Sequence, residues 1–131
     1  MEKVLDTESM ELIVYPKKKI IHHRIKDYIY GETFKTLFSK GVEEFEKYGC
    51  TKWLSDDRGS AALRREDVEW AQTNWEDKIL DKGWKYWAVV MPEKFMGQMT
   101  MKPIIERNEK MGLAVEVFND PFDAMDWLER Q

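Results

Sequence analysis

The sequence predicts one α/β domain over residues 1–131, with a mixed, mostly parallel five-stranded sheet, an N-terminal antiparallel hairpin and about four helices. Length and composition support a single domain, because 131 residues with 43% apolar and 35% charged side chains can form one self-sufficient core. Two strand patterns lie close together near the N-terminus, which predicts that they pair antiparallel. Strand and helix patterns then alternate to the end of the chain, which predicts parallel strands joined by helical crossovers.

The hairpin is predicted from residues 10–15 and residues 19–26. The first run is apolar, and the second alternates with a period of two, which is typical of a strand with two different faces. Pro16 and three lysines between the runs predict a turn. His22 and His23 are neighbours in the second run, so their side chains should point to opposite faces of the sheet, with His23 partly buried.

Residues 32–48 change to a helical period. Apolar residues and one glycine recur at spacings of three and four, which forms one stripe: Phe34, Leu37, Phe38, Gly41, Phe45 and Tyr48. Gly41 has no side chain, so we expect this helix to approach the sheet closely there. Gly49 follows the stripe, at a position where glycine often ends a helix.

Three further strands are predicted at residues 51–56, 85–91 and 113–118. The middle one contains a continuous apolar run from Trp87 to Met91. Such a run is typical of a strand that is buried on both faces, so we expect this strand to lie centrally in the sheet.

Three more helices are predicted in the second half of the chain. The first begins at about Arg65 and ends at Gly83, with acidic residues in its first turn and lysines in its last, which complements the helix dipole. Pro103 is a candidate first residue for the next helix, which would run to Met111. The pair Asp120-Pro121 is typical of the start of a helix, as N-cap and first helical residue.

Three stretches of the chain resemble a known family. Trp53–Arg58 is a strand that ends in acidic residues, Gly83–Val90 is a helix end that runs into the central strand, and Val117–Leu128 is a last strand with a terminal helix. With the order of the elements, they resemble the STAS family, and most closely its SpoIIAA-like branch, which is itself compared with the CRAL-TRIO lipid-binding domains. The resemblance covers nearly the whole chain. It implies a bacterial, non-enzymatic regulatory module that binds another protein.

The phosphorylated serine of this family has no counterpart in the chain. STAS proteins that antagonise anti-sigma factors carry it in an Asp-Ser-Ser/Ala-Gly stretch that opens the helix after the third strand. The corresponding stretch here, Leu63–Val68, contains no Ser, Thr or Gly, and the nearest hydroxyl is that of Ser60 in the preceding loop. The resemblance therefore implies a binding role without the phosphorylation switch.

A polar loop and the helix start that follows it form the predicted binding surface. Ligands of open α/β sheets bind at the carboxyl ends of strands, and this loop follows such an end. Arginines beside a helix N-terminus suit an anion or an acidic peptide, and an exposed Trp would anchor a partner. The predicted binding residues are Asp56, Asp57, Arg58, Ser60, Arg64, Arg65 and Trp70. The alternative is a solvated loop in which Asp57 pairs with Arg58 or Arg64.

A second hypothesis is a carrier or sensor of a small apolar or lipid ligand. Methionine is adaptable and suits soft ligands, and the comparison with CRAL-TRIO domains implies a lipid. The candidate apolar residues are Phe95, Met96, Met99 and Met101. This hypothesis requires a cavity under residues 93–111, and its alternative is a helix that merely covers the edge of the sheet. A third hypothesis is a small enzyme in which Asp56 and Asp57 act as acid and base.

Several other functions are disfavoured. A net charge of −4 with interspersed basic residues argues against nucleic acid. The single Cys50 excludes an internal disulfide, and no segment resembles a leader or a membrane span, so we expect a cytoplasmic protein. His22 and His23 should point to opposite faces of the sheet, and Cys50 has no second cysteine near it, which argues against a metal site. A nucleophile elbow and a glycine-rich phosphate loop are missing, so we expect no cofactor. The partner would be a protein or a small ligand, and the aromatic content is compatible with a homodimer.

Overall fold

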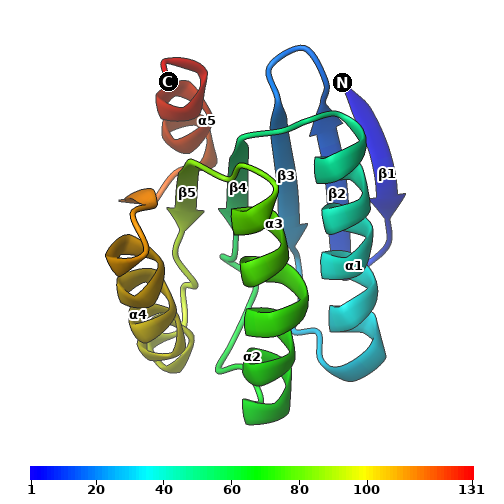
Figure 1. The fold of residues 1–131 in the computed structure, drawn as a ribbon. Helices are drawn as coiled ribbons and strands as arrows, with labels where there is room; N and C mark the ends of the chain where they lie inside the picture. Colours follow the sequence, from blue (N-terminus) through cyan, green and yellow to red (C-terminus); the bar gives the residue numbers. More distant parts are fainter.

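Six strands form one sheet in sequence order in the computed structural model, which describes residues 1–131 (Figure 1). They are β1 (Glu2–Asp6), β2 (Met10–Tyr15), β3 (Ile20–Ile25), β4 (Lys52–Asp56), β5 (Tyr86–Val90) and β6 (Ala114–Phe118). β2 pairs antiparallel with both β1 and β3, and β3, β4, β5 and β6 pair parallel. The predicted α/β class with a mixed sheet is confirmed.

The prediction of five strands was wrong by one, because Glu2–Asp6 forms the edge strand β1. Its pairing with β2 shifts register between Lys3 and Leu5, so the strand contains an irregularity around Val4. Such a bulge breaks the alternation by which a strand is recognised in a sequence. The strand is also charged at both ends, as edge strands often are.

The helices are α1 (Gly31–Lys47), α2 (Arg65–Ala71), α3 (Asp77–Asp81), α4 (Phe95–Lys110) and α5 (Pro121–Glu129). The π-helical segment η1 (Gln72–Glu76) joins α2 to α3 without a break, so these form one continuous helix. The predictions of a helix over residues 32–48, of one from Arg65 towards Gly83 and of one after Asp120 are confirmed. Asp120 caps α5 as expected, since its carboxylate accepts a hydrogen bond of 2.7 Å from the backbone N–H of Phe122.

The predicted start of a helix at Pro103 was wrong, because α4 begins eight residues earlier at Phe95 and contains Pro103 in its interior. The first turns of α4 are held by contacts with the loop just before the helix, and Gly97 also lies close to the backbone of Ala61. The side chain of Gln98 donates a hydrogen bond of 2.9 Å to the carbonyl of Pro92. Gly97 lies so close to Pro92 that a Cβ atom there would come within 2.7 Å of the proline Cβ.

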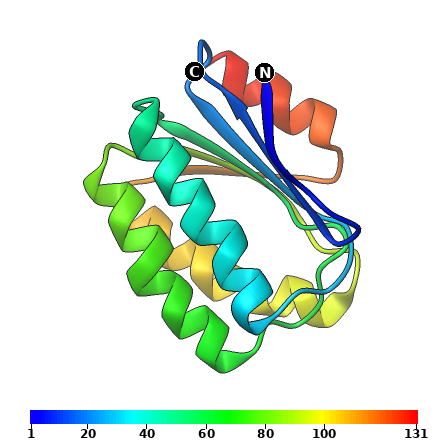
Figure 2. The ribbon, with the colours of Figure 1, turned by 90° about the vertical axis from the view of Figure 1, so that its right-hand side faces the viewer.

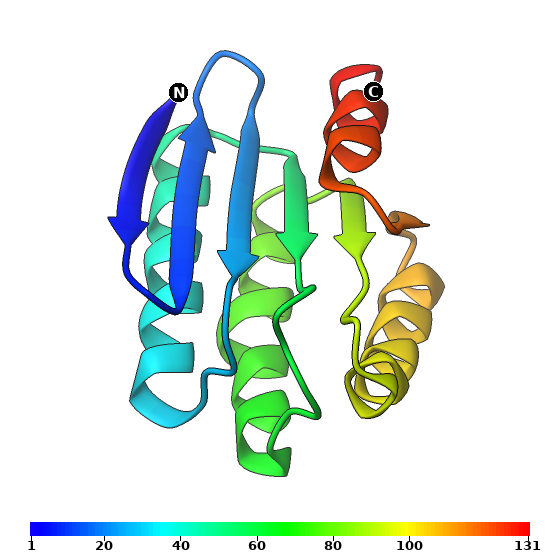
Figure 3. The same cartoon turned by 180° about the vertical axis from the view of Figure 1, so that it is seen from behind.

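The helices cover the two faces of the sheet unequally. From β3 to β6 the chain always moves to the next strand in the same direction, and right-handed crossovers then place every connecting helix on the same face. α1, the α2–α3 helix and α4 accordingly lie on one side of the sheet (Figures 1 and 2). α5 follows the last strand and packs on the other face against β4, β5 and β6 (Figure 3).

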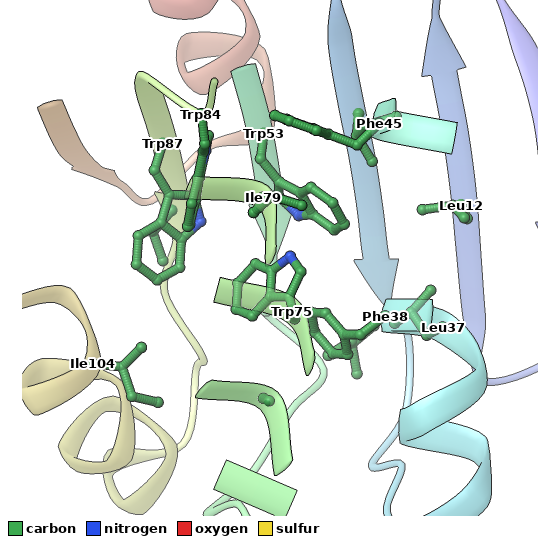
Figure 4. Packing of buried hydrophobic residues seen from close by; sticks show 14 of the residues in the cluster. Leu12, Leu37, Phe38, Phe45, Trp53, Trp75, Ile79, Trp84, Trp87 and Ile104 are labelled. Atoms are coloured by element: carbon green, nitrogen blue, oxygen red, sulfur yellow. The ribbon is translucent and has the colours of Figure 1, made fainter. Parts of the chain in front are cut away.

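Aromatic side chains dominate the larger core, between the sheet and α1, α2–α3 and α4 (Figure 4). Trp53 of β4 and Trp87 of β5 are fully buried, and Trp75 lies between them with ring centroids 5.3 and 5.7 Å away. Gly41 of α1 faces Trp53 so closely that a Cβ atom would come within 2.3 Å of its ring, which confirms the predicted close approach of helix and sheet.

Candidate functional site

The carboxyl ends of β3, β4 and β5 meet at the lower edge of the sheet in Figure 1, where α1 and α2 begin. Asp56 and Asp57 lie at this edge on consecutive residues and point to opposite faces of the sheet. Both carboxylates are buried, with 1% and 5% of the residue surface exposed. Each one has a different partner, so the pair does not form one site.

Asp56 binds Arg58 in a bidentate ion pair. The guanidinium Nε and Nη2 atoms donate hydrogen bonds of 2.9 and 2.8 Å to the two carboxylate oxygens. This hydrogen bonding raises the pKa of the Arg58 guanidinium above its ordinary value. The pair occupies both oxygens of Asp56 and holds the first turn of the loop against the sheet.

Asp57 belongs to a buried chain of hydrogen bonds on the helix-covered face. The indole N–H of Trp53 donates to Nδ1 of His23 at 2.9 Å, and Nε2 of His23 lies 2.7 Å from an oxygen of Asp57. Because Nδ1 accepts a hydrogen bond, the proton of the neutral imidazole is on Nε2 and is donated to Asp57. Both nitrogens of His23 are therefore used inside the protein. His23 is 1% exposed, so the expectation that it is partly buried was wrong: the side chain lies under Phe38 of α1.

The loop after Asp57 is fastened to the end of β3. The backbone N–H of Gly59 donates to the carbonyl of Ile25, and a Cβ atom on Gly59 would come within 2.4 Å of the carbonyl oxygen of Lys26. The N–H of Ser60 donates to the carbonyl of Asp57. Ser60 is buried as a result, and it faces the interior of the protein rather than a partner.

The remaining predicted binding residues lie on the surface. Arg64 forms an ion pair with Glu66 at 2.7 Å, which raises the pKa of its guanidinium, and Arg65 pairs with Glu69 at 3.0 Å. Trp70 is half-buried. Its ring meets Phe34 of α1 edge-on, and the ammonium group of Lys35 lies 6.0 Å from its centre. The seven predicted residues therefore divide into a buried group, Asp56, Asp57 and Ser60, and a group that reaches solvent, Arg58, Arg64, Arg65 and Trp70.

Two tyrosines that were not predicted extend the exposed group. Tyr28 and Tyr30 stack with ring centroids 5.7 Å apart, and the guanidinium of Arg64 lies 5.2 Å from the ring centre of Tyr30. Tyr30 is 54% exposed, which is unusual for so large a ring. An open hollow of about 380 Å³ is lined by Tyr28, Tyr30 and Arg64 among others. The signal in the sequence was the run Asp27–Gly31, where two tyrosines and an isoleucine stand in a loop between a strand and a helix.

A hydrogen bond joins the two helix starts beneath these side chains. The buried carboxylate of Asp67 in α2 accepts from the backbone N–H of Gly31 at the start of α1, at 3.1 Å. The start of α1, with Tyr30, is thereby held beside the start of α2, with Arg64 and Trp70. We name the four side chains Tyr28, Tyr30, Arg64 and Trp70 the aromatic–arginine patch.

The apolar residues of α4 do not converge on one pocket. Phe95, Met96 and Met99 are 68%, 61% and 44% exposed, whereas Met101 is buried. Met101 lines a cavity beneath α4, as required by the carrier hypothesis, but the cavity measures about 30 Å³. Pockets for small organic ligands typically measure about 300–1,000 Å³, so this cavity has the size of a water molecule rather than of a lipid.

Two further titratable groups lie away from the loop, the buried Cys50 and the half-buried His22. Burial raises the pKa of the Cys50 thiol to about 11. Burial lowers the pKa of His22 to about 4, and both ring nitrogens of His22 lack a partner in the protein. His22 lies opposite Leu54 on the face that carries α5, whereas His23 lies on the other face, which confirms that the two histidines diverge.

No three His, Cys, Asp or Glu side chains lie together in a way that could hold a metal ion. None of the helices combines the length and the apolar character needed to cross a bilayer. Neither a family model, nor a curated protein, nor a solved structure matches the chain.

Proposed function

We propose that the chain is a non-enzymatic, protein-binding module of the STAS type, and that its partner binds the aromatic–arginine patch. The observation that carries the proposal is the exposed Tyr30 ring with the Arg64 guanidinium over it, 5.2 Å from the ring centre. Tyr, Trp and Arg are the residues most enriched in the energetic centres of protein interfaces. All three occur here within two helix starts that Asp67 holds together.

Rigidity of the patch supports this function. Tyr28 stacks on Tyr30 and Trp70 packs against Phe34, so both contacts restrict the rings before a partner arrives. Pre-ordered side chains lose little conformational entropy on binding, which favours affinity. A suitable partner presents an apolar group to Tyr30 and Trp70 and hydrogen-bond acceptors to Arg64.

The buried polar groups at the same edge are less suited to catalysis. Both nitrogens of His23 and both oxygens of Asp56 are engaged inside the protein. The parallel strands also follow one another without a reversal of order. Open α/β sheets form their ligand crevice at such a reversal, so this edge favours a surface contact over an enclosed active site.

The test is native mass spectrometry of the chain purified gently from its own cells, with the variants Tyr30→Ala and Arg64→Ala. Phe122→Ala is the matched control, because Phe122 is 83% exposed and belongs to α5 on the other face. We expect a partner protein of defined mass and stoichiometry that both patch variants lose and the control retains. With the purified partner, each patch variant should weaken binding at least about tenfold, which corresponds to about 1.4 kcal/mol.

A partner that binds Tyr30→Ala and Arg64→Ala as tightly as the unaltered chain would contradict the proposed surface. A bound small molecule of defined mass in place of a protein would support the carrier hypothesis instead.

A further inference from the structure

Glu76 is a buried carboxylate with one oxygen that has no partner in the protein. It is 1% exposed and lies in the π-helical segment η1. Its Oε1 atom accepts hydrogen bonds from Arg107 at 2.6 Å and from Asn108 at 2.8 Å, both on α4. Its Oε2 atom accepts none. A buried carboxylate oxygen without a donor is unfavourable, because the hydrogen bonds that it loses to water are not replaced.

The π-helical segment brings Glu76 to this position. Trp75 and Glu76 are consecutive residues, and both are almost completely buried. π-helical turns are rare in proteins overall, and those that occur are often found at functional sites. Here the turn places Trp75 in the aromatic core and Glu76 between that core and α4.

Glu76 lines the cavity of about 30 Å³ beneath α4. The lining contains four further polar side chains, those of His23, Ser55, Asp57 and Ser60, and all four are at least nine-tenths buried. One buried water needs about 10–15 Å³ and two to four polar partners. The cavity meets both conditions, and Met101 and Ile104 close it on the side of α4.

We infer that this cavity binds a single water-sized molecule that donates a hydrogen bond to Oε2 of Glu76. Water and the ammonium ion share this chemistry. The lining supplies acceptors of the required kind, namely the carboxylates of Glu76 and Asp57 and the hydroxyls of Ser55 and Ser60. The bound molecule links α4, through Glu76, to the carboxyl end of β4 and to the loop that leads to the aromatic–arginine patch. This inference is independent of the proposed partner.

The test is NMR of the intact chain in water. We expect cross-relaxation at the water frequency, with the sign of a long-lived contact, at the indole N–H of Trp75, which lines the cavity and has no partner in the protein. The indole N–H of Trp53 should show none, because it is bonded to His23. In a second arm, ammonium chloride is compared with sodium chloride at equal ionic strength, and thermal stability is recorded.

The variant Glu76→Gln distinguishes the two molecules. A glutamine can keep its oxygen towards Arg107 and Asn108, and it then places an N–H donor in the cavity. A water molecule can accept from that donor, so its cross-peaks should persist. An ammonium ion can only donate, so any stabilisation by ammonium over sodium should disappear in this variant.

A cross-peak at the indole N–H of Trp75, or an ammonium-specific rise in stability that Glu76→Gln abolishes, would each support the site and name its occupant. Absence of both effects in the unaltered chain would overturn the inference. If Glu76→Gln does not fold, the first two measurements on the unaltered chain still decide the matter.

Discussion

Replacing Gly41 by alanine should destabilise the fold, although alanine is the better helix former. Gly41 lies within α1, and an added Cβ atom would come within 2.3 Å of Cη2 and 3.1 Å of Cζ2 of Trp53. Carbon atoms in favourable contact lie about 3.5–4.0 Å apart. Either α1 or the indole must therefore move by about 1 Å or more.

Trp53 has little freedom to move. It is fully buried, its indole N–H is bonded to His23, and its ring packs against Phe38, Phe45 and Trp75. A shift of the ring would disturb the hydrogen-bonded chain that ends at Asp57. Overpacking of a well-packed core costs about 1–3 kcal/mol and sometimes more, and a contact this short belongs at the upper end of that range.

The gain in helix propensity offsets part of this cost. Glycine to alanine within a helix is worth about 1 kcal/mol, which leaves a net loss of about 2 kcal/mol in the free energy of unfolding. Small domains have only about 5–15 kcal/mol in total. Urea denaturation followed by far-UV circular dichroism measures the change. Ser39→Ala, at an exposed position of the same helix, is the matched control and should be neutral or slightly stabilising.

A double-mutant cycle with Trp53→Phe identifies the cause. Phenylalanine lacks the outer ring atoms that the new Cβ would meet, so Gly41→Ala should cost less in that background. If Gly41→Ala is as stable as the unaltered chain, or if its cost does not depend on residue 53, the steric reasoning is refuted.

Two titratable side chains give further predictions. The pKa of His22 is depressed to about 4, against 6.5 for an ordinary histidine. As pH falls, His22 therefore takes up a proton in the unfolded chain before it does so in the folded chain. The free energy of unfolding should decrease progressively between about pH 6.5 and about pH 4. The full effect is at most about 3 kcal/mol, and His22→Phe should flatten the stability profile in this window; equal slopes for the two proteins would show that His22 is not the cause. Cys50 is 1% exposed with a pKa raised to about 11, so a thiol reagent at pH 8 should label it only after unfolding, and rapid stoichiometric labelling of the folded protein would contradict its burial.

Local patterns in the sequence determined most of the elements. The period of two over residues 19–26, the helical stripe of α1 and the pair Asp120-Pro121 each depend on neighbours a few residues away, and each led to the correct element. Gly41 also predicted a close approach of helix and sheet, because a glycine within an apolar helical stripe leaves room for a neighbouring element to come near the helix backbone. Period two further predicted that His22 and His23 diverge.

Only the tertiary structure decided where the polar residues find their partners. Asp56 and Asp57 looked equivalent in the sequence, yet one binds Arg58 from the next turn and the other binds His23, 34 residues earlier in the chain. Glu76 gave no signal at all, because its burial depends on a π-helical turn and on Arg107, 31 residues away.

The same reason explains β1 and the first turns of α4. β1 forms because its backbone pairs with β2, and the first turn of α4 lies where Gly97 closely approaches the backbone of Ala61. Periodicity records which face of an element is buried. It does not record hydrogen bonds and contacts between distant segments, and those contacts built both the aromatic–arginine patch and the cavity beneath α4.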